Sequence, residues 1–459
     1  MHSLSIFGTS SDAGKSTMAF AITYLLKKRG INVAPFKAQN VSNNSSVCDE
    51  GGEIAQPQFF TAESIALKTT PDFNPVLLKS GRGNGASLIV NGRSLNEQSV
   101  QEYYKNLDTL KPVVKSAFER LQDSYEVIVA EGAGSPVELN LMQKDLSNIY
   151  IADTFNTKII LVADIERGGV FASIWGVYNL LPAKLQKNVI GVIVNKFRGD
   201  MSLFDEGVKI IEERFGLNVL GVVPWKPFNL GFEDSQSIMG YVQDTKDCIV
   251  RVGVIKLPHI SNFTDFEPLV VDDEVEVLFI DSISQIHGCD ILVIPGTRRT
   301  NDDMFWLREN GFEDVIKNFR GTLITICGGY QMMFEKIIDE SSVESDIKSV
   351  DAFGLIEGIV EFKEEKKVTK GVYKLFGMEL NGYEIHHGMA SSIGVKKENF
   401  YGTFLHGLFD NDEFREDIFK EFGYKGFNFS EYKKSKIESY TDEISKVVDI
   451  DTIINELKK

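Results

Sequence analysis

Short apolar runs rich in β-branched residues alternate with longer segments of helical period through the first half of the chain. Most of these runs are continuously apolar, which is typical of parallel strands that are buried on both faces. Between them, apolar residues recur every three or four positions, as in 16–28 and 205–214, and this spacing predicts helices. The alternation predicts a doubly wound α/β domain. The predicted strands are 4–7, 32–36, 126–130, 159–163, 189–194 and 219–223.

A second series of apolar runs begins near residue 250, with "RVGVIKL", "EVEVLFI", "CDILVIPG" and "GTLITIC", and it ends with "GTFLHGLF" near residue 405. The polar, unpatterned stretch before this series predicts a linker at 236–249. We therefore predict two domains, at 1–235 and 250–459. Within the second, the charged segment 363–374 predicts a surface hairpin or loop, and the tail from 428 onward predicts one or two amphipathic helices.

Composition narrows the range of functions. The 459-residue chain has a formal net charge of −17, which disfavours a nucleic acid partner because phosphate contacts need clustered Lys and Arg. No run of 18 or more apolar residues and no basic leader occur, so we expect a cytoplasmic protein with no membrane partner. The cysteines lie far apart without a CxxC pair, which predicts neither a zinc site nor a disulfide framework. They are Cys48, Cys248, Cys289 and Cys327.

A phosphate-binding loop is predicted in the opening stretch, "SLSIFGTSSDAGKST". A strand, a turn and a helix that begins at Lys15 follow in order, so backbone N–H groups and a helix N-terminus can converge on a phosphate. The position of the usual first glycine holds Thr9, as in P-loop enzymes that resemble dethiobiotin synthetase. We predict an ATP site that comprises Thr9, Asp12, Gly14, Lys15, Ser16 and Thr17.

Carboxylates at strand ends are candidate ligands for Mg²⁺. Glu131 ends the run "VIVAE", at the sheet edge where open α/β sheets bind their ligands. Its carboxylate and the hydroxyl of Ser16 are oxygen ligands suited to Mg²⁺ bound beside a triphosphate. Asp49, in "SSVCDEGGE", is a second candidate metal ligand, although an acidic turn explains that stretch equally well.

Three further polar residues follow later strands of the predicted sheet. Asn195, in "VIVNKFRGD", occupies a position that commonly reads an adenine or guanine base. Arg167 and Arg198 supply the local positive charge that an acidic protein needs to bind an anionic substrate. We therefore predict Asn195 as a nucleotide contact and the two arginines as substrate contacts.

A cysteine nucleophile is predicted in "LITICGGYQMM", where Cys327 follows an apolar run and precedes glycines that open a helix. Such a strand-to-helix turn exposes a nucleophile. Together with Gln331, which we predict as a glutamine contact, Cys327 matches the C-x-G-x-Q pattern of class I glutamine amidotransferases. The backbone N–H groups of Gly296, in "VIPGT", and Gly328 are the expected oxyanion hole.

The general base must be a histidine, and the sequence offers two places for it. "GYEIHHG" contains His386 and His387, and "GTFLHGLF" contains His406. We predict His406, because it follows a strand-like run at the distance from the cysteine that class I amidotransferases keep. The usual His-Pro-Glu triplet is absent there, so the third member of the catalytic group is not identified.

Together these motifs resemble the cobyric acid synthases, glutamine-dependent enzymes of cobalamin assembly, over nearly the whole chain. The resemblance implies an N-terminal P-loop domain with a doubly wound parallel sheet and a C-terminal class I amidotransferase domain of flavodoxin-like fold. The motifs that carry it include "GTSSDAGKS", "PFKAQNVSNNS", "EGAGSPVELNL", "ADIERGGVFAS", "VNKFRGD", "ISNFTDFEPL", "ICGGYQ" and "GTFLHGLFD".

The resemblance also implies a reaction. ATP and Mg²⁺ would activate the b, d, e and g carboxylates of adenosylcobyrinic acid a,c-diamide, and L-glutamine would supply ammonia for their amidation. By the same resemblance Asp145, in "LMQKDLSN", would face the corrinoid. The partners are thus small molecules, and the sequence leaves a homo-oligomer open.

Three alternative functions account for fewer of these motifs. Cobyrinic acid a,c-diamide synthase shares both modules, but "QNVSNNS" and "NKFRGD" favour the cobyric acid synthases. A ParA/MinD-like ATPase switch would have no use for Cys327 and His406. A non-enzymatic protein that binds a corrinoid or an amino acid would not need Lys15, Glu131 and Cys327.

Overall fold

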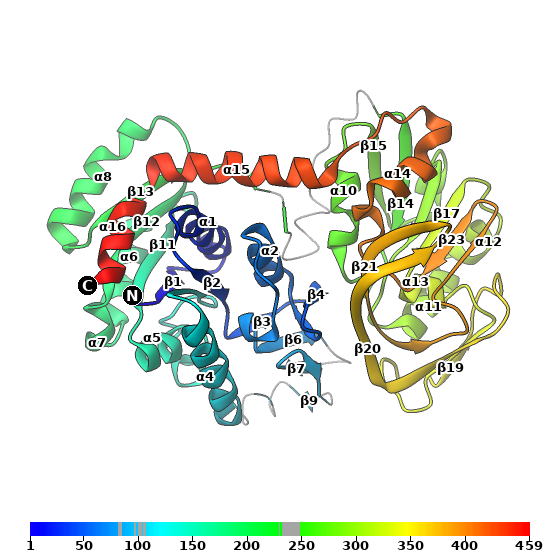
Figure 1. Ribbon diagram of the computed structural model, residues 1–459, viewed down its shortest axis with the longest axis horizontal. Helices are drawn as coiled ribbons and strands as arrows, with labels where there is room; N and C mark the ends of the chain where they lie inside the picture. The colour runs from blue at the N-terminus through cyan, green and yellow to red at the C-terminus, as the bar shows by residue number, and fades with distance from the viewer. Residues whose placement is uncertain (81–84, 96–97, 100–102, 104–106, 229, 232–247) are drawn as a thin grey trace.

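The structure, a computed structural model, consists of two α/β units that lie side by side (Figure 1). It describes residues 1–80, 85–95, 98–99, 103, 107–228, 230–231 and 248–459. The predicted linker at 236–249 lies outside the described residues except for its last two positions. Both chain termini lie in the first unit.

The first unit is built on a six-stranded parallel sheet in the order β13-β12-β11-β1-β10-β2, which confirms the predicted fold class. Successive side chains of a strand point to opposite faces, so Leu4 and Ile6 enter one core and Phe7 enters another. All six predicted strands belong to this sheet. They are β1 (Leu4–Gly8), β2 (Val33–Phe36), β10 (Val127–Glu131), β11 (Lys158–Asp164), β12 (Val189–Phe197) and β13 (Val219–Pro224).

Helices cover both faces of this sheet, as a doubly wound fold requires. The core with α1 lies on one face, and the cores with α4 and α6 lie on the other. The helices are α1 (Lys15–Lys28), α2 (Gln56–Ser64), α4 (Leu107–Ser124), α5 (Ile149–Phe155), α6 (Val170–Leu180), α7 (Ala183–Gln186) and α8 (Asp205–Lys209). Short strands are inserted after β2, namely β3 (Gln39–Val41), β4 (Ser45–Val47), β5 (Glu53–Ala55), β6 (Val76–Ser80), β7 (Gly85–Val90), β8 (Arg93–Ser94) and β9 (Gln98–Ser99).

The second unit contains a sheet in the order β15-β14-β16-β17-β23-β22, parallel except for its last pair. Its strands are β14 (Val250–Ile255), β15 (Val275–Ile280), β16 (Ile291–Ile294), β17 (Thr322–Ile326), β22 (Gly394–Lys397) and β23 (Phe400–Thr403), and a smaller sheet contains β18 (Lys336–Ile338), β19 (Ser349–Asp351), β20 (Ile359–Leu375) and β21 (Met378–Met389). Helices α10 (Glu267–Val270), α11 (Thr300–Glu309), α12 (Phe312–Lys317), α13 (Gly328–Gln331) and α14 (Asp412–Phe419) complete the unit.

The last two helices, α15 (Phe429–Val447) and α16 (Ile450–Lys458), confirm the predicted amphipathic tail. They run back from the second unit to the first (Figure 1). Their apolar side chains, such as Ile437, Ile444 and Ile453, belong to the core that contains Leu4 and Met18 of the first unit. The predicted boundaries 1–235 and 250–459 stay a prediction, to which the structure adds that the C-terminal helices pack on the first unit.

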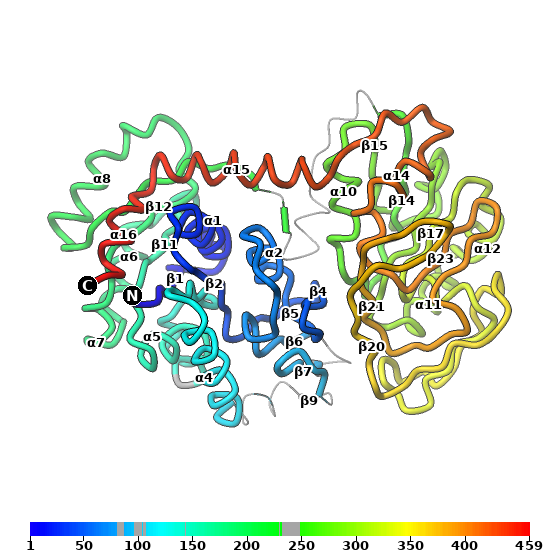
Figure 2. The backbone as a smooth tube through the Cα atoms, in the orientation of Figure 1, coloured from blue at the N-terminus to red at the C-terminus, as the bar shows by residue number. Residues whose placement is uncertain are grey.

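The long β20–β21 hairpin contains the charged segment that was predicted to be a hairpin or loop. It leans against β4 of the first unit (Figure 2). There Lys366 pairs with Glu53 at 2.9 Å and Lys370 pairs with Asp49 at 2.7 Å. Glu53 is buried and also pairs with Lys79. Burial lowers the pKa of Lys79 to about 8 even though Glu53 opposes the shift, so this ion network joins the two units at a desolvated contact.

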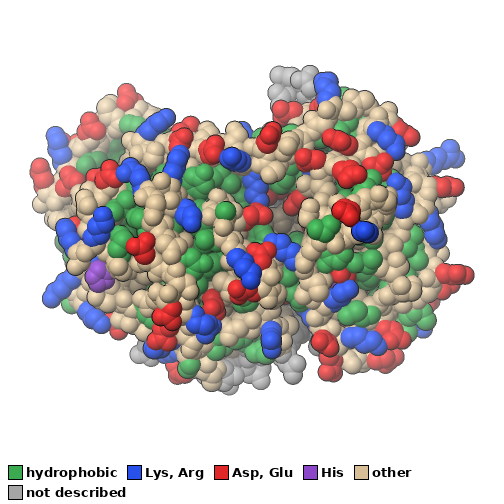
Figure 3. All heavy atoms as spheres, viewed as in Figure 1, with side chains coloured by type: hydrophobic (Ala, Val, Ile, Leu, Met, Phe, Trp, Pro, Cys, Tyr) green, Lys and Arg blue, Asp and Glu red, His purple; other side chains and the backbone are tan. Residues whose placement is uncertain are grey.

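The surface carries charges of both signs. Acidic and basic side chains are interspersed over the face drawn in Figure 3, so the net charge of −17 does not form one acidic patch there.

In the part of the chain that the structure describes, no helix has the length and apolar character needed to cross a bilayer.

Candidate active sites

The phosphate loop lies between β1 and α1, as predicted. The N–H of Thr9 donates to the carbonyl of Val162 at 2.9 Å, so Thr9 extends the sheet edge. A Cβ added at Gly8 would lie 2.8 Å from Nζ of Lys15. The glycine that comes one residue earlier than usual therefore gives Lys15 room to fold back over the loop, where its Nζ donates to the carbonyl of Ser10 at 3.0 Å.

Gly14 closes the loop in a conformation that favours glycine. Its φ is 93°, and a Cβ there would lie 2.1 Å from the amide nitrogen of Asn195. That nitrogen donates to the carbonyl of Ala13 at 2.9 Å. Asn195 therefore packs against the phosphate loop and binds its backbone. Its contact with an adenine or guanine base stays a prediction.

Ser16 and Glu131 meet at the foot of the loop. The Ser16 hydroxyl donates to Oε1 of Glu131 at 2.6 Å. Lys37 pairs with the same oxygen at 2.7 Å, and Gln58 donates to Oε2 at 3.2 Å. Glu131 is 4% exposed, so burial and these partners hold its carboxylate in one orientation.

The donor set fits Mg²⁺, which takes oxygen ligands and is usually held by one or two carboxylates together with substrate phosphates. Ser16 supplies a hydroxyl oxygen and Glu131 a carboxylate. Among the described residues, no group of three or more His, Cys, Asp and Glu side chains gathers in a way that could hold a metal. A metal at this position would therefore take most of its ligands from the nucleotide and water.

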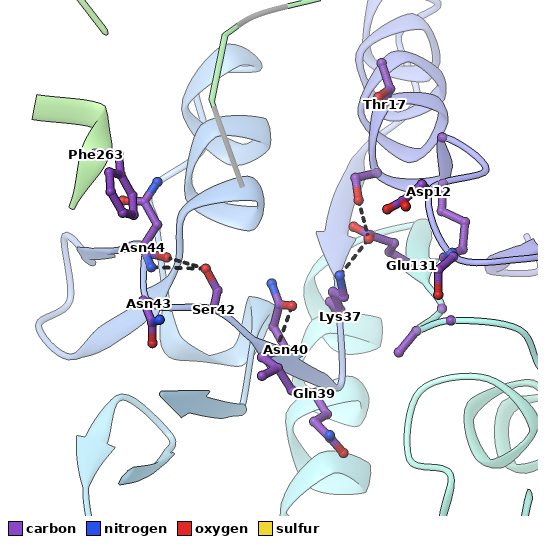
Figure 4. Close-up of a pocket in the computed structure, with 18 of the residues that line it drawn as sticks. Asp12, Thr17, Lys37, Gln39, Asn40, Ser42, Asn43, Asn44, Glu131 and Phe263 are labelled. Carbon is purple, nitrogen blue, oxygen red and sulfur yellow. Dashed lines mark hydrogen bonds and ion pairs between the residues drawn. The ribbon is translucent and has the colours of Figure 1, made fainter. Parts of the chain in front are cut away.

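A cavity of about 640 Å³ lies over the phosphate loop and continues along β3, a volume usual for a small-molecule site. Five of the predicted nucleotide contacts line it, and so does Lys196. The turn after β3 forms the far wall together with Phe263, which comes from the second unit and lies beside Asn44 (Figure 4). The five predicted contacts are Asp12, Gly14, Lys15, Ser16 and Thr17.

The two predicted substrate arginines lie outside the lining of this cavity. Arg167 donates to Asp12 at 3.2 Å, and Arg198 donates to Glu166 at 2.7 Å. The guanidinium of Arg198 also lies 4.0 Å from the ring centroid of Trp225. Both arginines are exposed, and their contact with a substrate stays a prediction.

Two predicted carboxylates serve other contacts. Asp49 accepts hydrogen bonds from the N–H and hydroxyl of Thr69 and pairs with Lys370 of the second unit. Asp145 accepts backbone N–H bonds at the start of α5, from residues 147, 148 and 150. Neither lines the cavity, so the structure brings Ser16 and Glu131 together without Asp49. Their roles as metal ligand and corrinoid contact stay predictions.

Cys327 lies in the second unit at a sharp turn between β17 and α13. Its φ of 49° and ψ of −108° are strained for a residue with a side chain, which is typical of a nucleophile elbow. The turn is packed against the loop after β16. A Cβ at Gly328 would lie 2.6 Å from the side chain of Thr297, and a Cβ at Gly296 would lie 3.6 Å from the Cβ of Cys327. The two predicted oxyanion glycines therefore flank the cysteine.

His406 is the predicted base that contacts the cysteine. The ring lies beside the cysteine, since a Cβ at Gly296 would lie 3.6 Å from both Nε2 of His406 and the Cβ of Cys327, and Nδ1 lies 2.7 Å from Oδ2 of Asp265. Burial lowers the pKa of His406, but the charges of Asp265 and Cys327 outweigh it and raise the pKa to about 10. The buried carboxylate of Asp265 therefore favours the imidazolium form of the ring.

The competing histidines have other partners. His386 lies 3.1 Å from Oε2 of Glu384 and 2.7 Å from the carbonyl of Gly388 through its two ring nitrogens. His387 lies 2.9 Å from the carbonyl of Lys363, and burial lowers its pKa to about 4. The geometry thus favours His406 over the other two. Gln331, the predicted glutamine contact, packs against Gly388.

Comparisons with known proteins agree with this two-site arrangement. Residues 4–230 match the CobQ/CobB/MinD/ParA nucleotide binding domain, and residues 251–414 match the CobB/CobQ-like glutamine amidotransferase domain. The chain is 52% identical to the cobyric acid synthase of Acinetobacter baylyi, over 90% of this chain and 89% of that protein. It is 40% identical to the cobyric acid synthase of Syntrophobacter fumaroxidans, over 89% and 87% of the two chains, and 36% identical to that of Clostridium novyi, over 90% and 87%. The chain belongs to the cobyric acid synthase family.

Membership of the cobyric acid synthase family makes this chain a glutamine-dependent amido-ligase with an ATP-binding P-loop domain. The match to the nucleotide binding domain alone would also admit a MinD- or ParA-like switch, since that family includes both. The amidotransferase domain and the full-length relatives decide between these alternatives.

Sequence reasoning missed Asp265, Lys37 and Phe263. Each lies in a stretch that carries the family resemblance, "ISNFTDFEPL" or "PFKAQNVSNNS". The resemblance therefore marked these stretches, but it did not indicate what the three side chains contact. Phe263 and Asp265 stand two residues apart on the 3-10 helix η5 (Phe263–Phe266). Phe263 lines the cavity of the first site, and Asp265 contacts His406 in the second. One short turn therefore touches both sites.

Proposed function

We propose that this enzyme amidates the b, d, e and g carboxylates of adenosylcobyrinic acid a,c-diamide to give adenosylcobyric acid, and that it uses ATP, Mg²⁺ and L-glutamine. The observation that carries the proposal is the shared turn, which joins a phosphate-loop cavity to a cysteine-histidine pair. An enzyme that uses ammonia at one site needs a source of it within the same protein, because free ammonia is scarce at neutral pH.

The first site activates the acid. A carboxylate oxygen of the corrinoid attacks the γ-phosphorus of ATP, the bond to the β-phosphate oxygen breaks, and ADP leaves with the bonding electrons. Lys15 and the loop N–H groups neutralise charge on the phosphates. Mg²⁺ held by Ser16 and Glu131 would add positive charge to the triphosphate. The product is an acyl phosphate, whose carbonyl carbon ammonia attacks; phosphate leaves, a proton is lost and an amide remains.

The second site releases the ammonia. His406 takes the proton of the Cys327 thiol, the sulfur attacks the carboxamide carbon of glutamine, and the N–H groups of Gly296 and Gly328 stabilise the oxyanion. The imidazolium of His406 gives its proton to the departing ammonia, which leaves a thioester. His406 then takes a proton from water as the water attacks this thioester, and glutamate is released.

Mass spectrometry of the corrinoid tests the proposal. With ATP, Mg²⁺ and glutamine, we expect a ladder of four products, each lighter than the one before by the difference between OH and NH₂. Cobyrinic acid offered in parallel tests cobyrinic acid a,c-diamide synthase as the alternative. Conversion of cobyrinic acid to its diamide, with the diamide itself left unchanged, would overturn the proposal. The cytoplasmic location stays a prediction, which fractionation of the producing cell would test.

A further inference from the structure

Tyr383, on β21, is joined to the predicted base His406 in two ways. The two residues form an isolated antiparallel bridge, with His406 N–H donating to the Tyr383 carbonyl at 2.9 Å and Tyr383 N–H donating back at 3.2 Å. Their rings also stack, at 5.3 Å between centroids and 20° between planes. Any movement of the tyrosine ring therefore acts directly on the imidazole that contacts Cys327.

The hydroxyl of Tyr383 reaches across to the first unit. It donates to the carbonyl of Ser45, the first residue of β4, at 3.3 Å. The residue before it, Asn44, lines the cavity of the first site together with Ser42. The Tyr383 side chain thus contacts both predicted sites. Its ring stacks on His406, and its hydroxyl binds Ser45, which follows the cavity residue Asn44.

The turn at 262–266 reinforces this contact. Asn262 donates from its side chain to the Tyr383 hydroxyl at 3.4 Å, and the Thr264 hydroxyl lies 3.5 Å from Oδ1 of Asn44. Burial and the nearby charge of Asp265 raise the pKa of Tyr383 well above its usual value. The phenol therefore keeps its proton and its role as a donor at every working pH.

We propose that Tyr383 is a positioning residue that couples glutamine hydrolysis at Cys327 to occupation of the ATP and corrinoid cavity. A substrate that presses on the turn containing Ser42 and Asn44 shifts the Ser45 carbonyl, and the Tyr383 hydroxyl follows it. The stacked ring then changes the position of His406 relative to the sulfur. Displacements below one ångström suffice, because the rates of proton and acyl transfer depend steeply on alignment. The inference rests on the proposed function of both sites.

The test compares Tyr383→Phe with the unchanged protein. The variant keeps the stacked ring and the backbone bridge but loses the hydroxyl that reaches Ser45. The measurement is glutamate release with and without ATP and the corrinoid, and the stimulation ratio is the quotient of the two rates. We expect this ratio to fall at least about threefold, the order of one lost hydrogen bond. Ammonia-dependent amidation should stay unchanged, and more glutamate should be released per amide formed.

Tyr401→Phe is the matched control, since the Tyr401 hydroxyl donates to Asp417 at 2.9 Å within the second unit and touches neither site. Asn262→Gly is a second test variant, because glycine accepts the φ of 53° at this position while the donor to Tyr383 is lost. Asn262→Gly should also lower the stimulation ratio. If Tyr383→Phe does not fold, this variant alone tests the coupling role. A ratio that stays at the unchanged protein's value in the folded variants would overturn the coupling role. Failure of the unchanged protein to form amides would instead overturn the proposed function.

Discussion

Asp265 contacts the ring of His406, although it does not stand just after the histidine, where the third catalytic residue usually does. Oδ2 of Asp265 lies 2.7 Å from Nδ1 of His406, and the N–H of the next residue, Gly407, donates to Oδ1 at 2.8 Å. The two residues are 141 positions apart in the chain and both are buried. A carboxylate that contacts both the ring and the following peptide fixes the position and the charge of the imidazole, which explains why no acidic residue needs to follow His406.

Asp265→Asn should disable glutamine hydrolysis and spare the first site. The amide keeps the shape of the carboxylate but loses the charge that raises the pKa of His406, so the imidazolium form of His406 loses its buried counter-charge. We expect the rate of glutamate release to fall by about 100-fold or more, while amidation from ammonium salts continues. The pH profile of alkylation of Cys327 should shift as well. Asp417→Asn, which changes an acid paired with Lys396, is the control; equal losses in both variants would count against a role at His406.

Cys327→Ala and Lys15→Ala should separate the two sites. Without the sulfur nucleophile, glutamine should no longer support amidation, whereas ammonia should still do so. Without the lysine, the ATP-dependent step should fail with either nitrogen source, and slow glutamine hydrolysis should persist. Glutamate release and corrinoid amidation measured on the same samples check both statements. Loss of ammonia-dependent amidation in a folded Cys327→Ala protein would mean that the sites do not divide the reaction as proposed.

Local sequence signals predicted the elements well. Continuously apolar runs identified the strands of the first sheet, because a strand that is buried on both faces needs apolar side chains at every position. The phosphate loop and the cysteine elbow were predictable for a similar reason, since each is a strand-turn-helix segment that is contiguous in the chain. Lys15, Ser16 and Cys327 lie where those motifs indicated.

Contacts between distant segments could not be predicted in this way. Lys37 and Asp265 complete the two sites from a loop and a short 3-10 helix whose sequences have no periodic signal, and only the folded sheet edges bring them to Glu131 and His406. The C-terminal helices show the same limit. Their amphipathic pattern predicts an apolar face, but that face could cover either unit, and the packing of α15 against α1 and β13 is set by the assembled fold.

Glu131→Gln should weaken the first site through its metal. The amide can still accept a hydrogen bond from Ser16, but it lacks the charge that balances Lys37 and attracts Mg²⁺. We expect amidation to fall by about 100-fold or more and to recover in part at high Mg²⁺, while glutamine hydrolysis measured without ATP changes little. Glu126→Gln, at an exposed position just before the same strand, is the matched control. Full activity of Glu131→Gln at ordinary Mg²⁺ would exclude the carboxylate as a ligand.

The buried carboxyl of Glu267, in α10, should make stability depend on pH. Burial raises its pKa to about 8, with the charge of Lys433 opposing the shift, and the N–H of Gly231 donates to it at 2.9 Å. Its usual pKa is 4.5, so between pH 4.5 and 8 the unfolded chain has released a proton that the folded chain still binds. Stability therefore falls as pH rises through this window.

Glu267→Gln keeps the acceptor for Gly231 and removes the titrating group, so it should flatten the fall. At pH 8 we expect the variant to be more stable than the unchanged protein by about 1–3 kcal/mol, after allowance for relaxation around a buried charge. Differential scanning calorimetry at several pH values between 5 and 8 measures the effect. Glu309→Gln, at an exposed position of α11, is the control and should leave the slope unchanged. If the melting temperatures of Glu267→Gln and the unchanged protein run parallel across this range, Glu267 is ionised in the folded protein, because only a group that titrates differently in the two states can alter the slope.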